Sequence, residues 1–261
     1  MNSGRPERPA PVDILGVPVH PVDYAGTLEL LTAWLDAEGP GGAGPTRQIC
    51  TVNPEFIVEA RHNSRFRQVL NEAWLNVPDG VGVLRVLNLH GCRLTERVTG
   101  TDLIPRLAEL CAARGWRMFL LGAAPGVAMA AADVLAKRFP GLEVCGTWSG
   151  SPADEDWPVI HRLLADTQPH VLLVAFGHPR QDLWIHSRLG DLHSRVAIGV
   201  GGAFDFMAGK VPRAPGWMRD RGLEWLYRLL RQPARWRRML SLPVFVLLVA
   251  KERLAGKAAQ K

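Results

Sequence analysis

The 261-residue sequence lacks the features that mark several large classes of protein. Its four cysteines stand far apart and form no CxxC pair, so neither a metal site nor a disulfide framework is expected, and a reducing cytosol fits. The N-terminal stretch MNSGRPERPAPVD has no apolar segment of the signal-peptide kind. The longest apolar run, 240–250, is about half of the ~20 residues that a spanning helix needs, and Pro243 interrupts it. We therefore expect no transmembrane segment.

The overall composition is that of a globular protein with an excess of positive charge. Apolar residues make up 47% and charged residues 21% of the chain, and this length suffices for one large domain or two small ones. The net charge of +6 favours an anionic partner, which leaves nucleic acid, phosphates and an acidic membrane surface open.

Apolar segments typical of buried strands alternate with helical patterns along the chain. Several of these strands are apolar on both faces, which predicts an α/β fold of the Rossmann-like kind, with a mostly parallel sheet and helices on both faces. Ligands bind such sheets outside the carboxyl ends of the strands. The expected strands are 47–52, 73–78, 117–122, 142–148, 170–177 and 195–202. The expected helices are 54–63, 101–115, 125–139, 154–167 and 181–189.

The composition changes near the C-terminus. Eight arginines and no lysine occur between Arg213 and Arg238, interleaved with tryptophan and tyrosine. We therefore divide the chain into a disordered N-terminus (1–11), a Rossmann-like domain (12–209) and a basic, aromatic C-terminal appendage (210–261).

Asp79 stands in the segment VPDGVGVL, between an expected strand end and a helix start. A carboxylate at this edge can act as a general base, and the flanking Gly80 and Gly82 would let a ligand approach the backbone. The alternative is that Asp79 only caps the following helix.

Polar residues follow other strands in the same way. Thr51 and Asn53 in CTVNPEF can hydrogen-bond a ligand, although Asn53 also suits a helix cap. Gln181 begins a helix after AFGHPR, and the preceding His178 can titrate near neutrality or be a solvated loop residue. Asp205 follows the glycines of GVGG, where it can hold a sugar hydroxyl.

Two further motifs have competing interpretations. Gly122 and Gly126 in LLGAAPG resemble a nucleotide-binding turn at a helix N-terminus, or a turn that only packs a helix on a strand. The triplet 154–156 is nominally a DxD motif of the kind that holds a divalent metal. It begins an expected exposed helix, so we interpret Asp154 as an N-cap and predict no metal site.

These motifs together resemble one family. TVNPE, NVPDGVG, ERVTGTDL, FLLGAAPG, LLVAFGHPRQD, GVGGAFDFMAG and RAPGWMRDRGLEWLYRL are similar to segments of the WecG/TagA/CpsF glycosyltransferases, glycosyltransferase family 26. The resemblance extends over residues 12–250. The last of these motifs is long enough to be specific.

The resemblance implies a bacterial, cytoplasmic enzyme that associates peripherally with the inner face of the cytoplasmic membrane. Such an enzyme moves a sugar from a UDP-sugar to a saccharide on polyprenyl diphosphate, with inversion and without a metal or other cofactor. Its products enter teichoic acid or other surface polysaccharides. N-acetylmannosamine, its uronic acid and glucose are all open as the donor sugar. The appendage is expected to be helical and to dock at the membrane, and a homo-oligomer is left open.

The resemblance also assigns roles to residues of this chain. By matching motif, Asp79 is the catalytic base, and Asp205 lies on the nucleotide-sugar side. The remaining matches are pocket residues and appendage arginines that reach the diphosphates, namely Thr51, Asn53, Arg97, Gln181, Arg228, Arg235 and Arg238. Asp182 replaces the glutamate that the family usually has after the glutamine.

Three rival functions remain open from the residues alone. Another Rossmann-type nucleotide-binding enzyme is one, but the sequence has no GxGxxG fingerprint. A nucleic-acid-binding module is suggested by the basic C-terminus, and would show steeply salt-dependent binding. A membrane scaffold without chemistry would not need polar residues after five strands. We expect no nucleic acid partner.

Overall fold

The computed structural model describes residues 6–37, 44–231, 233 and 236–259. Part of the expected disordered N-terminus, 1–5, thus lies outside the described residues. The rest of that stretch has no regular secondary structure, and its Arg8 guanidinium donates a hydrogen bond to the backbone carbonyl of Trp74.

Six parallel strands form the central sheet in the order β4–β3–β8–β7–β5–β6. They are β3 (Arg47–Val52), β4 (Leu75–Pro78), β5 (Arg117–Gly122), β6 (Glu143–Trp148), β7 (Val171–Ala175) and β8 (Val196–Gly199). The predicted parallel α/β sheet is therefore confirmed. β7 and β8 end earlier than expected, because Gly177 and Gly201 take positive φ angles that turn the chain out of the sheet.

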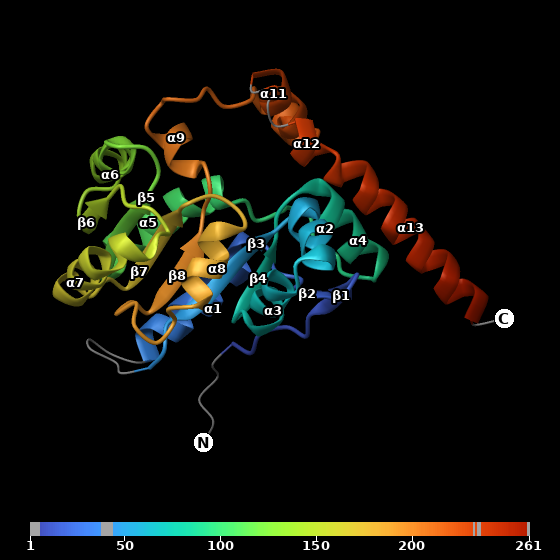
Figure 1. Cartoon of the computed structure of the whole chain (residues 1–261), viewed down its shortest axis with the longest axis horizontal. Coiled ribbons are helices and arrows are strands. Elements are labelled where there is room, and N and C mark those ends of the chain that lie inside the picture. Colours follow the sequence, from blue (N-terminus) through green and yellow to red (C-terminus); the bar gives the residue numbers. More distant parts are fainter. Residues whose placement is uncertain (1–5, 38–43, 232, 234–235, 260–261) are drawn as a thin grey trace.

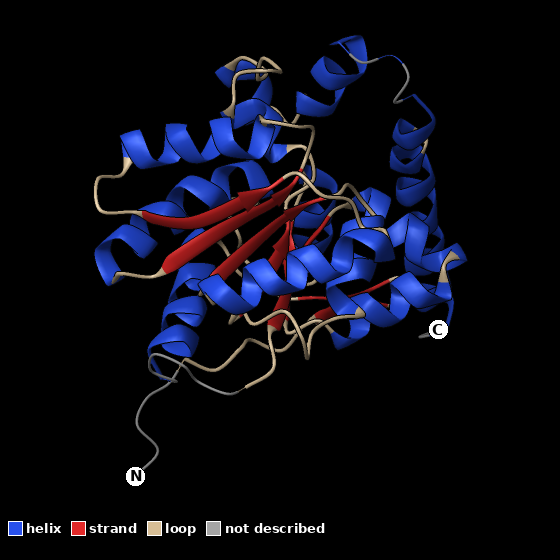
Figure 2. Cartoon of the chain, turned by 60° about the vertical axis from the view of Figure 1, so that its left-hand side comes forward, coloured by secondary structure: helices blue, strands red, loops and turns tan. Residues whose placement is uncertain are grey.

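Helices cover both faces of this sheet, as predicted, and Figure 2 shows the strands lying between them. On β5, Met118 and Leu120 face one helical layer while Phe119 and Leu121 face the other, because strand side chains alternate. The first layer comprises α1 (Tyr24–Ala37), α5 (Gly100–Arg114), α6 (Val127–Arg138) and α9 (Ala203–Met207). The second comprises α2 (Pro54–His62), α3 (Ser64–Glu72), α4 (Val81–Leu89), α7 (Trp157–Thr167) and α8 (Arg180–His186).

Several elements were not expected from the sequence. A short antiparallel hairpin, β1 (Val12–Ile14) and β2 (Val17–Val19), precedes the sheet, and α1 and α3 are also additional. The expected helix 154–167 is instead a 3₁₀ turn (Asp154–Asp156) followed by α7. Three-residue strands are too short for an alternating pattern to stand out in a sequence.

The C-terminal segment is helical and packs against the Rossmann-like domain. It comprises α10 (Gly216–Asp220), α11 (Glu224–Arg231), α12 (Trp236–Met239) and α13 (Ser241–Ala259), and Figure 1 shows it along one side of the molecule. α13 contacts α2 and α4, and Phe245 is buried in the core cluster that these helices share. The boundary at residue 210 stays a prediction. Within the described residues, no helix is long and apolar enough to span a membrane.

Candidate active site

A cavity of about 930 Å³ opens at the carboxyl edge of the sheet. Thr51, Asp79, Ala175 and Val200 line it at the ends of the four neighbouring strands β3, β4, β7 and β8. Residues of α11, α12 and α13 line the other side. The cavity thus lies between the sheet edge and the C-terminal segment, which is where parallel α/β sheets bind their ligands.

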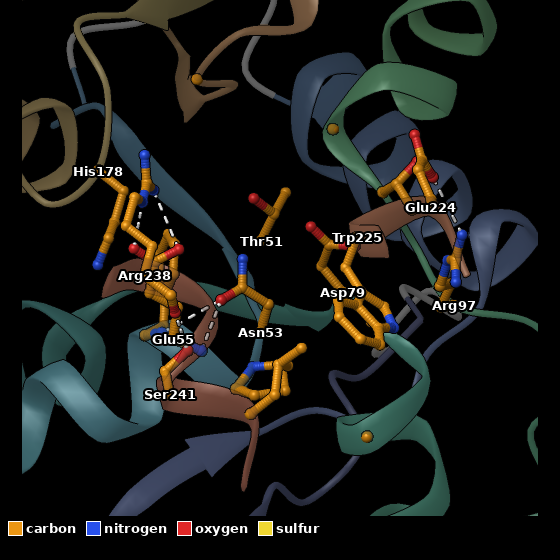
Figure 3. A pocket seen from close by; sticks show the side chains of 18 of the residues that line it. Thr51, Asn53, Glu55, Asp79, Arg97, His178, Glu224, Trp225, Arg238 and Ser241 are labelled. Carbon is orange, nitrogen blue, oxygen red and sulfur yellow. Dashed lines mark hydrogen bonds and ion pairs between the residues drawn. The ribbon is translucent and has the colours of Figure 1, made fainter. Parts of the chain in front are cut away.

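Backbone hydrogen bonds fix the position of Asp79 at this edge. Its N–H donates to the carbonyl of Val52 at 2.7 Å, and the Val98 N–H donates to the carbonyl of Pro78 at 2.7 Å. The interpretation of Asp79 as a helix cap is wrong, because Gly80 with φ of 94° occupies the N-cap position of α4. The Asp79 carboxylate is half-buried and faces the cavity (Figure 3).

Packing within the protein accounts for the two glycines beside Asp79. A Cβ atom on Gly82 would lie 3.1 Å from Pro54 Cγ and 3.3 Å from Phe245 Cε1, and a Cβ on Gly80 would lie 3.3 Å from Pro54 Cδ. α4 therefore fits closely against the start of α2 and against α13. This close packing holds the loop of Asp79 against the C-terminal segment.

Thr51 and Asn53 both line the cavity at the end of β3. Asn53 is also the N-cap of α2, since its Oδ1 accepts hydrogen bonds from the N–H groups of Glu55 at 3.0 Å and Phe56 at 3.2 Å. The two interpretations of Asn53 are therefore compatible. Its Oδ1 is engaged by the helix, and its side chain still borders the cavity.

Arg97 is part of an ionic network that joins the Rossmann-like domain to the C-terminal segment. Its Nη2 lies 3.2 Å from Glu224 Oε2 at the start of α11 (Figure 3). Glu224 Oε1 lies 3.8 Å from Arg213 Nε, and Arg213 makes two 2.6 Å hydrogen bonds to the carboxylate of Asp102 in α5. Charges of opposite sign thus alternate along the network, and Arg213 and Glu224 of the C-terminal segment lie between Asp102 and Arg97.

A second ion pair belongs to the lining at the other end of the cavity. Arg238 of α12 donates from Nε and Nη2 to the two carboxylate oxygens of Glu55 in α2, at 2.5 and 3.0 Å (Figure 3). Forked pairs of this kind fix both position and orientation. Of the other two predicted arginines, Arg235 and the side chain of Arg228 lie outside the described residues.

His178 is enclosed, and its interpretation as a solvated loop residue is wrong. Its ring stacks on Phe56 with centroids 4.1 Å apart and meets the edge of Phe66. Burial, followed by the charge of Arg238, lowers the pKa of His178 to about 3. The expectation that His178 titrates near neutrality is therefore also wrong. Its ring stays neutral near pH 7 and lines the cavity.

Gln181 supports the loop after β8. Its Oε1 accepts a hydrogen bond from the N–H of Gly201 at 2.9 Å, and the residue is buried. The neighbouring Asp182 is fully buried, and that burial raises the pKa of its carboxyl to about 7. Both side chains pack closely against Gly199, where a Cβ atom would lie 2.5 Å from Gln181 Nε2 and 2.6 Å from Asp182 Oδ1.

Of the remaining predicted residues, one lines the cavity and two do not. Asp205, in the first turn of α9, lines the cavity. Gly122 and Gly126, at the end of β5 and the start of α6, are not among its described lining residues. A Cβ atom on Gly122 would lie 2.8 Å from Phe176 Cδ1, so packing accounts for that glycine. Nucleotide binding by this turn stays a prediction.

Asp154 does not cap a helix, so that expectation is wrong. Ala153 and Asp156 precede the 3₁₀ turn and α7, and neither helix start receives a side-chain hydrogen bond. The Asp154 carboxylate instead lies 2.6 Å from Arg188 Nη2. Among the described residues, no group of three or more acidic, histidine or cysteine side chains is placed to hold a metal ion.

Sequence reasoning missed several side chains that line the cavity, among them Glu55, Glu224 and Trp225. Glu55 pairs with Arg238 and Glu224 pairs with Arg97, and both of these arginines were predicted to belong to the site. A usable signal was present for both, because Glu55 follows Asn53 by two residues and Glu224 is a rare acid within the arginine-rich segment. Trp225 stands next to Glu224 in the same motif.

The arrangement combines one carboxylate at the sheet edge with arginines at both ends of a large cavity. A carboxylate can accept a proton from a bound hydroxyl, and arginines bind phosphate oxygens with forked geometry. The cavity is large enough for more than one sugar-sized group. The site is therefore suited to transfer chemistry between an alcohol and a phosphorylated donor.

Comparison with known proteins gives consistent matches over most of the chain. The family model described as "Glycosyl transferase WecG/TagA/CpsF family" matches residues 12–259. A relative from Bacillus spizizenii is 40% identical over 210 residues, which cover 80% of this chain and 81% of the relative. Relatives from Bacillus subtilis strain 168 (35% identity, 78% and 79% coverage) and Staphylococcus aureus strain MRSA252 (30% identity, 96% of both chains) are similar. Each is named N-acetylglucosaminyldiphosphoundecaprenol N-acetyl-beta-D-mannosaminyltransferase.

Proposed function

The chain belongs to the WecG/TagA/CpsF glycosyltransferase family, and we propose that it transfers N-acetylmannosamine from UDP-N-acetylmannosamine to N-acetylglucosaminyl diphosphoundecaprenol. The names of the relatives supply the acceptor and the sugar. They favour N-acetylmannosamine over its uronic acid and over glucose. The product would serve the synthesis of a cell-surface polymer such as teichoic acid.

The observation that carries the proposal is the position of Asp79. Its carboxylate stands at the strand edge in a cavity that also contains Arg97 and Arg238. In an inverting transfer, Asp79 takes the proton of the acceptor hydroxyl while that oxygen forms a bond to the anomeric carbon. The bond from the anomeric carbon to the diphosphate oxygen breaks on the opposite face. UDP leaves with the electron pair, and Asp79 then releases the proton to water.

The leaving diphosphate needs positive charge where its own charge develops. Arg97 and Arg238 border the cavity from opposite ends, and each is held in place by a carboxylate. Exchange of Glu55 for a diphosphate oxygen would bring the oriented guanidinium of Arg238 to the substrate. Asp205 would contact the nucleotide-sugar from the α9 side, and Thr51, Asn53 and Gln181 would shape the pocket around it.

The lipid-linked acceptor places the reaction at a membrane surface. Large apolar side chains of the C-terminal segment are exposed, among them Leu230, Leu247 and Leu254, each 70% exposed. Arginines accompany them in the same segment. A segment of apolar and basic residues binds the interface of an anionic membrane. We therefore assign the enzyme to the cytoplasm, bound peripherally to the inner face of the cytoplasmic membrane.

A donor and acceptor screen tests the proposed function. Purified full-length protein is incubated with a short-chain N-acetylglucosaminyl diphosphate lipid and UDP-N-acetylmannosamine, its uronic acid or UDP-glucose, and released UDP and the lipid product are measured. Product with UDP-N-acetylmannosamine supports the proposal. Product with another donor only would refute the assigned sugar. Thermal stabilisation by NAD but not by UDP would instead favour another Rossmann-type enzyme.

A further inference from the structure

Trp225 is unlike the other tryptophans of this protein in its surroundings. Among the tryptophans that the structure describes, it alone lines the cavity. It lies in the first turn of α11, directly after Glu224, and both Trp225 and Asp79 belong to the lining of the cavity that Figure 3 shows. The side chain is 39% exposed. A large aromatic surface is thus presented to the cavity instead of being buried in the core.

An exposed indole in a cavity that also contains a carboxylate is suited to binding a pyranose ring. One face of a pyranose presents C–H groups with partial positive charge, which the negative face of an aromatic ring attracts. The hydroxyls at the rim of the same sugar need acceptors and donors. Asp79, and the Arg97–Glu224 pair that adjoins Trp225 in the chain, supply both kinds of group.

The position relative to Asp79 indicates which sugar is bound. The base must touch the attacking hydroxyl, so the ring next to Asp79 is the acceptor ring; this step rests on the proposed function. We propose that Trp225 is the stacking platform for the N-acetylglucosamine ring of the lipid-linked acceptor. It thereby forms an acceptor subsite between α11 and the end of β4.

The Arg97–Glu224 pair gives this subsite a fixed position. Glu224 is held by Arg97 at 3.2 Å and lies 3.8 Å from Arg213, which in turn is fixed to Asp102 by two hydrogen bonds. The four charges join α11 to the segment before α5 and to α5 itself. Because Trp225 follows Glu224 directly, docking of α11 brings the indole to the acceptor side of the cavity. The proposal leaves the donor diphosphate to the other end of the cavity, where Arg238 pairs with Glu55.

Binding measurements on four variants of the full-length protein test the assignment. Calorimetry gives the Kd of UDP and of a soluble, short-chain N-acetylglucosaminyl diphosphate lipid for Trp225→Leu, Trp225→Ala, Trp225→Phe and Trp148→Ala. We expect Trp225→Leu and Trp225→Ala to weaken acceptor binding about tenfold, the scale of one lost aromatic contact, and Trp148→Ala to leave it unchanged. Trp225→Phe should stay within about threefold of the wild type, because a ring face remains. UDP binding should change less than about twofold in all four.

Trp148 is the matched control, since it is also 39% exposed but is not among the described residues that line the cavity. Unchanged acceptor binding in Trp225→Leu would overturn the proposal. Equal weakening of UDP and acceptor would overturn it as well, and would place the indole on the nucleotide or in a purely structural role. Because binding is read without turnover, a failed donor screen would refute the proposed transfer and leave this test intact. Trp225→Leu keeps an apolar side chain should Trp225→Ala fail to fold.

Discussion

Arg238 and Glu55 form a two-point ion pair in the lining of the cavity, with N···O distances of 2.5 and 3.0 Å, although they lie 183 positions apart in the chain. The pair joins α12 to α2. Within the pair, Glu55 occupies the guanidinium of Arg238, which we assign to the diphosphate of the substrate. Binding of an anionic substrate must therefore compete with Glu55.

This competition predicts the effect of Glu55→Gln. The amide is neutral and cannot hold Arg238 as a charged pair, so UDP and pyrophosphate should bind more tightly, by about three- to tenfold at low salt. Calorimetry measures both ligands. Glu59→Gln, one turn further along α2, is the control because Glu59 hydrogen-bonds Asn63 and is not among the described lining residues. Weaker UDP binding in Glu55→Gln would show that Glu55 positions Arg238 and does not compete with substrate.

Asp79→Asn should remove most of the transferase activity. The amide keeps the size of the side chain but cannot accept the proton, and general-base assistance is typically worth about 10²–10⁴ in rate. Steady-state release of UDP in the presence of acceptor measures kcat. UDP affinity, measured separately, should be retained. A variant with near-normal kcat would exclude Asp79 as the base.

Asp182 should make the protein less stable as the pH rises from about 4 to about 7. Burial raises its pKa in the folded state to about 7, against about 3.9 in an unfolded chain. Between these values the folded state holds a proton that the unfolded state has lost, so the free energy of unfolding falls with rising pH. The cost is complete above pH 7.

Asp182→Asn removes this titration. We expect the Tm difference between the variant and the wild type to grow in favour of the variant from pH 4 to pH 7 and to be constant above that. Differential scanning calorimetry across this range measures the difference. Parallel Tm curves for the two proteins would show that the Asp182 carboxyl does not titrate in this window.

Phe245→Ala should loosen the C-terminal segment. Phe245 is 2% exposed and packs on Gly82 beside the loop of Asp79, and removal of a buried phenylalanine ring typically costs about 3–5 kcal/mol. Limited proteolysis should then cleave before α13 faster than in the wild type, and kcat should fall. Leu247→Ala, at a position 70% exposed on the same helix, should leave both unchanged in a detergent assay. Unaltered proteolysis of Phe245→Ala would refute this role.

Leu247→Asp and Leu254→Asp together should weaken binding to vesicles that contain anionic lipid. Both residues are 70% exposed on α13, and an acidic side chain is repelled by the anionic surface and does not enter the apolar layer. Co-sedimentation with vesicles measures the bound fraction. Val134→Asp, at a 44% exposed position on α6, is the control. Equal sedimentation of the double variant and this control would argue against docking through α13.

The main features of the Rossmann-like domain could be predicted from the sequence because they depend on local patterns. Buried parallel strands are apolar on both faces, and β3 and β5 have the bounds that this pattern predicted. Since parallel strands present their carboxyl ends at one edge, the polar residues after β3, β4, β7 and β8 were expected to meet, and they line one cavity. The resemblance to a glycosyltransferase family also followed from the sequence and is confirmed.

The tertiary structure alone decided which of these residues become partners and what their environment does to them. The pairing of Arg238 with Glu55 and of Arg97 with Glu224 depends on how the C-terminal segment packs over the sheet edge, which no local pattern encodes. His178 and Asp182 have shifted pKa values because distant segments remove them from water. Periodicity is a property of neighbours in sequence, whereas desolvation and ion pairing are set by neighbours in space.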